Sequence, residues 1–123
     1  MNQPLRVYPT SASQEYFSDE GCHILEILND PSTPAISLAR ARVEVGGKTR
    51  LHALSDTIEL YYILQGHGLV YIGGDNREIS TGDCVKIEKG VDQRIDNIGD
   101  EDLVFLCICH PRFQESNYRD TEE

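Results

Sequence analysis

Apolar residues along this chain occur in short runs with a two-residue period, and no stretch shows the longer period of an amphipathic helix. Between residues 36 and 45, alanine and valine alternate with charged side chains, which places Arg40 and Arg42 together on a polar face. Gly, Asn, Asp and Pro separate the runs, as is usual for tight turns. The pattern therefore predicts an all-β chain. We expect strands near residues 23–28, 36–45, 59–65, 68–72, 84–88, 93–97 and 103–109.

The two ends of the chain differ in pattern from its middle. Residues 1–14 are polar and contain proline, and residues 114–123 are charged with little apolar content, so both segments are expected to be flexible. Residues 15–113 then form a single predicted domain, since 123 residues with 39% hydrophobic content suffice for one core. Many short strands at this spacing indicate a sandwich or a barrel.

The net charge restricts the possible partners. The chain has 21 acidic and 11 basic residues, and the resulting charge of −10 would repel nucleic acids and anionic membrane surfaces. No apolar run approaches the roughly 20 residues that span a bilayer, and the N-terminal sequence lacks the basic and apolar parts of a signal peptide. We therefore expect a cytoplasmic protein whose partner is a small molecule rather than nucleic acid or membrane.

Four cysteines could in number form two disulfides, but a cytoplasmic domain of this size is expected to keep reduced thiols. Cys107 and Cys109 alternate along an apolar strand, so both side chains should face the same way. Buried small hydrophobic residues explain the pair better than a zinc site, because no second cysteine pair accompanies it.

The residues with the clearest chemical potential follow a glycine turn at Gly46. His52 comes after this turn, and the next predicted strand carries Glu59 and Tyr61 on one face. An imidazole and a carboxylate at the mouth of a barrel suit zinc, iron, nickel or manganese. The alternative is structural, with His52 as a hydrogen-bonded turn residue and Glu59 paired in the interior.

Residues 46–66 resemble the first motif of the cupin family. In that motif a Gly is followed after five residues by His-x-His, then after three or four by Glu, and after six more by Gly. Gly46, His52, Glu59 and Gly66 occupy these positions. Leu54 stands where the second His would be.

Residues 82–97 are similar to the second cupin motif, which runs from Gly through Pro-x-Gly to a His and then an Asn. Gly82, Gly90 and Asn97 match it. Glu88 replaces the Pro, and Gln93 replaces the His. The resemblance spans roughly residues 36–109, and the small stand-alone cupins that this chain resembles are often described as mannose-6-phosphate isomerase-like.

The resemblance implies a jelly-roll barrel, also called a double-stranded β-helix. Cupins with complete motifs bind a divalent metal through three His and one Glu, so the metal ligands implied here are His52, Glu59 and Gln93. Glu59 and Tyr61 are the candidate catalytic residues, as base and acid. Further candidates are Asp56 as an oxygen ligand and His110 at the rim, whereas His23 and His67 are expected to be structural.

Two functions remain open at this point. The first is a metal-dependent isomerase, dioxygenase or lyase that acts on a small organic or sugar-like anion, which Arg40 or Arg42 would hold if these side chains lined the barrel. The second is a non-catalytic metabolite-binding cupin with a decayed metal site, which Leu54 and Gln93 favour. The resemblance also implies a homodimer, because small cupins commonly pair or exchange N-terminal strands.

Overall fold

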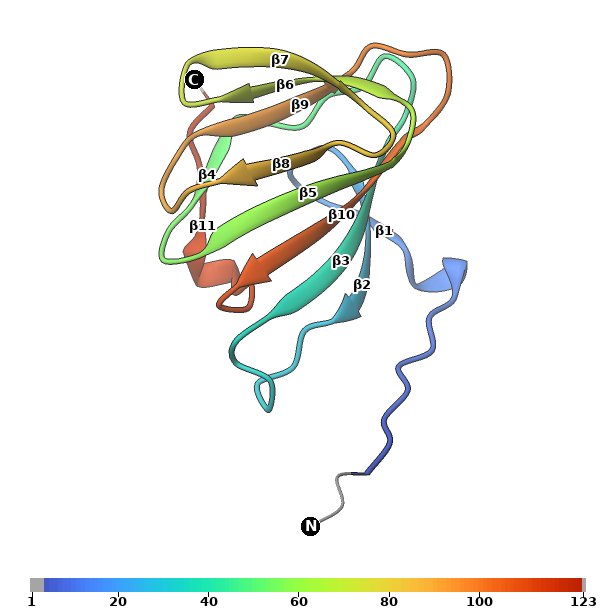
Figure 1. The fold of residues 1–123 in the computed structure, drawn as a ribbon, viewed down its shortest axis with the longest axis vertical. Helices are drawn as coiled ribbons and strands as arrows, with labels where there is room; N and C mark the ends of the chain where they lie inside the picture. The colour runs from blue at the N-terminus through green and yellow to red at the C-terminus, as the bar shows by residue number, and fades with distance from the viewer. Residues whose placement is uncertain (1–3, 123) are drawn as a thin grey trace.

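The computed structural model describes residues 4–122 and shows a jelly roll of two antiparallel sheets (Figure 1). This confirms the all-β barrel that the sequence predicts. One sheet has the strand order β1-β2-β3-β10-β5-β8, and the other has β11-β4-β9-β6-β7. The strands are β1 (Tyr16–Phe17), β2 (His23–Leu28), β3 (Ser37–Val43), β4 (His52–Leu54), β5 (Ile58–Gln65), β6 (His67–Ile72), β7 (Asp75–Ser80), β8 (Cys84–Ile87), β9 (Gln93–Asn97), β10 (Leu103–His110) and β11 (Tyr118–Asp120).

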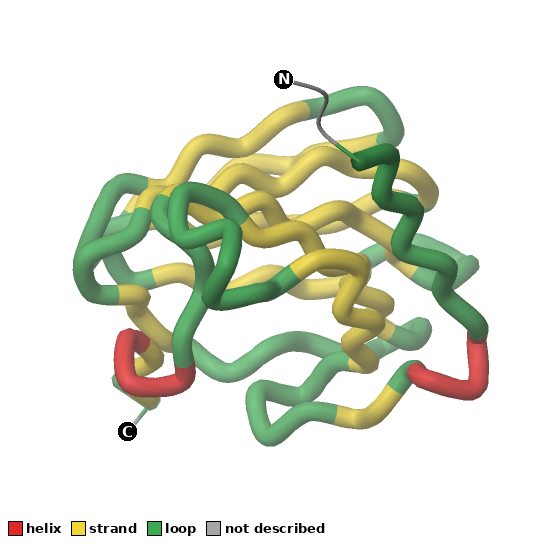
Figure 2. Tube along the Cα trace, turned by 90° about the horizontal axis from the view of Figure 1, so that it is seen from below, coloured by secondary structure: helices red, strands yellow, loops and turns green. Residues whose placement is uncertain are grey.

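Two short 3-10 helices, η1 (Ala12–Gln14) and η2 (Glu115–Asn117), lie outside the strands (Figure 2). In the described part of the chain, no helix is long and apolar enough to cross a membrane.

Each of the seven predicted strands corresponds to a strand of the structure, and four more strands were not predicted. Among these, β7 was missed because residues 75 and 76 read as part of a turn. The turn consists instead of Gly73 and Gly74, whose φ angles are +57° and +94°. Two residues with positive φ form the tight hairpin loop whose twist suits antiparallel strands, so β7 begins directly at Asp75.

Parts of both terminal segments belong to the folded structure. Ser11 caps η1, and its side chain and Gln14 form a reciprocal capping box. At the other end, β11 pairs with β4, with Asp120 opposite His52. The segment expected to be an acidic flexible tail thus contributes a strand beside a candidate site residue.

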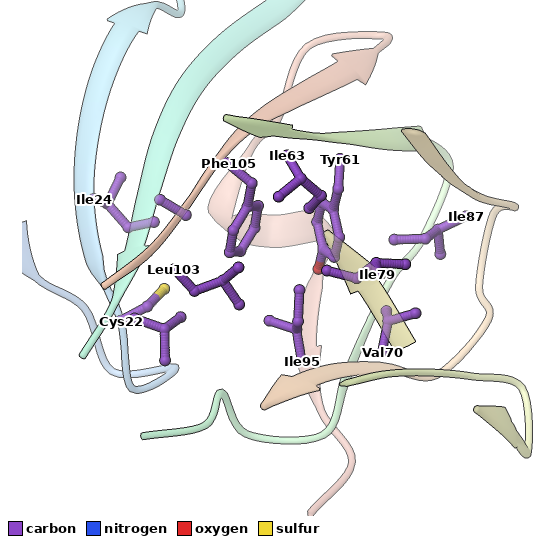
Figure 3. Close-up of a cluster of buried hydrophobic side chains, with 12 residues drawn as sticks. Cys22, Ile24, Tyr61, Ile63, Val70, Ile79, Ile87, Ile95, Leu103 and Phe105 are labelled. Atoms are coloured by element: carbon purple, nitrogen blue, oxygen red, sulfur yellow. The ribbon is translucent and has the colours of Figure 1, made fainter. Parts of the chain in front are cut away.

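The core lies between the two sheets and follows from the two-residue period. Along β5, Glu59, Tyr61 and Ile63 point inward and are buried, whereas Tyr62 and Leu64 on the opposite face are about 40% exposed. Figure 3 shows Tyr61 and Ile63 with their neighbours in the interior. Each fully buried large apolar side chain contributes roughly 1.5–3 kcal/mol through burial. The main members of this cluster are Ile63, Val70, Ile87, Ile95, Leu103 and Phe105.

Arg40 and Arg42 are absent from the cavity lining, so the condition under which they would hold an anion in the barrel is not met. Arg42 donates through Nη2 to Glu15 at 2.6 Å and through Nη1 to Asp102 at 3.0 Å. Arg40 lies 3.4 Å from Glu15. Ala39 and Ala41, at the alternate positions of β3, face the interior instead.

Candidate functional site

A cavity of about 510 Å³ lies at one end of the barrel. Strands β2, β3, β5 and β10 form its walls, and β4 with the segment around β11 closes one side. Of the predicted site residues, the cavity lining includes His52, Glu59 and Tyr61. The cavity therefore brings together side chains that are distant in sequence, as an active or binding site requires.

His52 is held in a fixed orientation at the cavity wall. Its Nδ1 lies 2.7 Å from the Arg50 carbonyl oxygen, which requires a proton on Nδ1 and leaves Nε2 free to accept a proton or bind a ligand. Nε2 lies 3.5 Å from Oε2 of Glu20. The imidazole also stacks on Tyr118, with ring centroids 5.1 Å apart and an interplanar angle of 22°.

Glu59 is the buried carboxyl group of the cavity and is only 7% exposed. Within the described residues it has no cationic partner, and its Oε2 accepts a weak hydrogen bond from Cys109 Sγ at 3.7 Å. Burial raises its pKa to about 8, and the negative charge of Glu20 adds to the rise. Contacts with Gln93, Cys109 and Cys107 lower this pKa only partly.

Tyr61 and Gln93 form a buried hydrogen-bonded pair next to Glu59. The Tyr61 hydroxyl donates to Gln93 Oε1, and burial, followed by the charge of Glu59, holds the pKa of Tyr61 well above its usual value. Gln93 is fully buried, so its side chain points inward, but it lies behind Tyr61 and outside the cavity lining. Its Nε2 is buried without a hydrogen-bond partner.

The three predicted metal ligands lie in the interior of the barrel. His52 and Gln93 are direct partners across β4 and β9, and both are buried, as is Glu59. However, no three His, Cys, Asp or Glu side chains among residues 4–122 are arranged to hold a metal ion. The only metal-binding atom of the Gln93 amide, Oε1, already accepts the Tyr61 hydroxyl. Metal binding by these residues stays a prediction.

The other histidines and Asp56 lie outside the cavity lining. Asp56 is exposed in the turn between β4 and β5, where it adopts a φ of 62°. His110 contacts the Ala35 carbonyl oxygen at 2.7 Å, and His23 and His67 lie near acidic side chains at the surface. None of these four residues reaches the candidate site.

Several residues that complete the cavity are not indicated by any motif or pattern of the sequence. Glu20 lies in the turn before β2, and Tyr118 lies in β11, within the predicted flexible tail. The only hint for Glu20 is its place beside Gly21, whose φ of +95° marks a tight turn leading into β2. Cys107 and Cys109 both line the cavity, which confirms that they face the same way, and all four cysteines are free thiols.

The fold and the site define a class of protein: a small antiparallel barrel with a partly polar cavity that opens at one end. The profile described as "Cupin domain" matches residues 39–109, which is more than half of the chain. The chain therefore belongs to the cupin family.

Two curated relatives extend this likeness. The uncharacterized protein MJ1618 of Methanocaldococcus jannaschii is 36% identical over 109 residues, covering 87% of this chain and 85% of the relative. An oxalate-binding protein of Thermotoga maritima is 34% identical over 70 residues, covering 57% of this chain and 58% of the relative.

Solved structures show the same fold. A predicted oxalate decarboxylase from Thermotoga maritima matches with a TM-score of 0.68 and 28% identity, over 73% of this chain and 80% of that chain. The nucleoside dehydratase Pac13 of Streptomyces matches with a TM-score of 0.78 over 95% of this chain and 92% of that chain, but its identity of 15% shows the fold alone.

Proposed function

We propose that this chain binds a small polar organic molecule in the barrel cavity and that Glu59 contacts the bound molecule directly. The observation that carries the proposal is a carboxyl group that is 93% buried, faces a cavity of about 510 Å³ and has no cationic partner in residues 4–122. Ligand pockets typically measure roughly 300–1,000 Å³. The oxalate-binding relative supports a small-molecule ligand of some kind.

Glu59 and Tyr61 are the groups proposed to exchange protons with a substrate if the bound molecule is converted. Both line the cavity, and both carry an exchangeable proton in a buried environment. The Tyr61 hydroxyl donates a hydrogen bond to Gln93 Oε1, so this hydrogen bond would have to break before Tyr61 could donate a proton to a substrate.

Calorimetric titration and native mass spectrometry of the untagged protein test the binding proposal. We expect a co-purified or added small molecule to bind the wild type with one-to-one stoichiometry and to bind Glu59→Gln at least about tenfold more weakly. The matched control is Glu78→Gln, because Glu78 is exposed on β7 and outside the cavity lining. Equal affinity of the wild type and Glu59→Gln would contradict the role of Glu59.

The second candidate is the metal-dependent enzyme acting on a small organic or sugar-like anion, of isomerase, dioxygenase or lyase type. The observation that favours it is that His52 and Glu59 line one cavity. The Arg50 carbonyl oxygen accepts a hydrogen bond from His52 Nδ1, so Nε2 is the ring nitrogen that could bind a metal ion. Zinc, iron, nickel or manganese would be the metal. Gln93 Oε1 already accepts the hydrogen bond of the Tyr61 hydroxyl. Metal binding by His52, Glu59 and Gln93 together would therefore require the Tyr61–Gln93 hydrogen bond to break.

Elemental analysis of protein purified without a tag or chelator tests this second candidate. Near-stoichiometric metal in the wild type that drops in His52→Ala would support it. No metal in the wild type, even after reconstitution, would count against it. Localisation in the cytoplasm and the formation of a homodimer stay predictions.

A further inference from the structure

The cavity lining is acidic and lacks basic side chains. Asp19, Glu20, Glu26, Glu59 and Glu115 all border the cavity. None of the described residues in the lining is Lys or Arg, and the only imidazole is that of His52. An anion placed here would lose its hydration and meet carboxyl groups instead of opposite charges.

Glu59 adds a second, independent observation. Acidic residues at a surface are ordinarily solvated, but Glu59 is 93% buried and faces the cavity without a cationic partner in the part of the chain that the structure describes. Ionisation of a buried carboxyl group is unfavourable unless a positive charge compensates it, so a cation is the ligand that would stabilise the charged form. The arginines of the neighbouring strand do not supply that charge, since Arg40 and Arg42 pair with Glu15 on the outer face.

Aromatic rings form much of the remaining wall. The aromatic residues of the lining are Tyr16, Phe17, Tyr61, Phe105, Phe113 and Tyr118, of which Tyr16 and Phe17 are 50% and 63% exposed. The face of an aromatic ring carries negative potential and attracts cations, most strongly where water is excluded. Carboxylates combined with aromatic rings are therefore the chemistry that recognises an organic ammonium group.

We propose that the molecule bound in this cavity is a small organic cation, an amine or alkylated ammonium compound whose positive charge lies near Glu59 and Glu20. The inference rests on the proposed function, because it names the class of ligand for the same cavity. A bare metal ion fits less well, since the cavity is far larger than an ion and no three ligands in residues 4–122 converge on one point.

Isothermal titration with three molecules of nearly equal shape tests the charge. The first probe is the cation choline. The second is dimethylbutanol, a neutral molecule in which a carbon atom replaces the choline nitrogen. The third is dimethylbutanoate, the corresponding anion. A chelator in the buffer removes metal ions from all three titrations. We expect choline to bind at least about tenfold more tightly than dimethylbutanol, and dimethylbutanoate to bind most weakly.

Two variants test whether the charge of Glu20 causes the preference for the cation. Glu20→Gln should weaken choline binding severalfold and leave dimethylbutanol binding unchanged, because only the cation interacts with this charge. The control Glu78→Gln should change neither affinity, since Glu78 is outside the cavity lining.

The outcomes separate the two proposals. If dimethylbutanol or dimethylbutanoate binds as tightly as choline, the cavity binds small molecules but the inference of a cationic ligand is overturned. If none of the three binds at millimolar concentration, the proposed binding function fails, and this inference fails with it.

Discussion

At the scale of single residues, Glu59 couples the stability of the protein to pH. Its pKa is raised from 4.5 to about 8 in the folded state, mainly by burial. Between pH 4.5 and pH 8, Glu59 keeps its proton in the folded protein but has released it in the unfolded chain. The contribution of Glu59 to stability is therefore complete below about pH 4.5 and is lost as the pH rises towards 8.

Glu59→Gln should therefore stabilise the protein at neutral pH by up to about 3 kcal/mol, and by much less at about pH 5. The variant keeps the side-chain volume and an oxygen that can accept the Cys109 thiol, but it cannot ionise. Urea unfolding of both proteins across this pH range measures the difference, and other titrating groups cancel in the comparison. Parallel pH profiles of the two proteins would contradict the prediction.

The pair of Tyr61 and Gln93 makes a second residue-scale prediction. Tyr61→Phe removes the hydrogen bond that the Tyr61 hydroxyl donates to Oε1 of the fully buried Gln93 amide, so we expect a loss of roughly 1–3 kcal/mol in the free energy of unfolding. The double variant Tyr61→Phe/Gln93→Met should lose less than the sum of the single variants, because it leaves no polar group unpaired. The control is Tyr62→Phe on the exposed face of β5, which should change stability by less than about 0.5 kcal/mol. If the losses of unfolding free energy in the two single variants add up to the loss in the double variant, Tyr61 and Gln93 are not energetically coupled and the prediction is contradicted.

At the scale of secondary-structure elements, strands with many apolar residues can be predicted from the sequence. Short or polar strands cannot, because they form only by pairing with a neighbouring strand. The strands β5 and β10 have eight residues each and are rich in apolar residues, and both are predicted from the sequence. In contrast, β7 has a polar sequence with one buried residue, and β11 has three residues. Such segments carry no period that local reasoning could recognise.

The same distinction applies to the candidate site. His52, Glu59 and Gln93 lie on the family motifs, so the sequence pointed to them, and Tyr61 follows from its place two residues after Glu59. Glu20 and Tyr118 reach the cavity only because a turn and a terminal strand fold back over it. No spacing within the chain encodes these long-range contacts.

The strand β11 therefore makes the element-scale prediction. A chain ending at Gln114 lacks the strand that pairs with β4 and the Tyr118 ring that stacks on His52. We expect a loss of roughly 2 kcal/mol in the free energy of unfolding and faster amide hydrogen exchange in β4. The hairpin of β6 and β7 is the internal control, because β11 does not pair with it. Unchanged exchange in β4 would show that β11 does not stabilise this wall of the cavity.

At the scale of the whole molecule, residues 4–10 extend away from the barrel (Figure 1). Leu5 and Val7 are 92% and 76% exposed, and they occupy alternate positions of an extended segment. Apolar side chains at alternate positions give an extended segment one apolar side, which can pack on an exposed apolar surface of another molecule. The outer face of β5 offers a complementary apolar surface, since Tyr62 and Leu64 are exposed there.

We propose that two copies of the chain associate through these surfaces, and light scattering coupled to size-exclusion chromatography tests this. The wild type should elute with twice the mass of the 13.8 kDa chain. The double variant Leu5→Asp/Val7→Asp should shift to the monomer, because two charges would be buried at the interface. The control Val45→Asp changes another exposed apolar residue, in the loop after β3, and should stay dimeric. A wild type that is monomeric at every concentration would overturn the proposal, and a dimer that persists in the double variant would place the interface elsewhere.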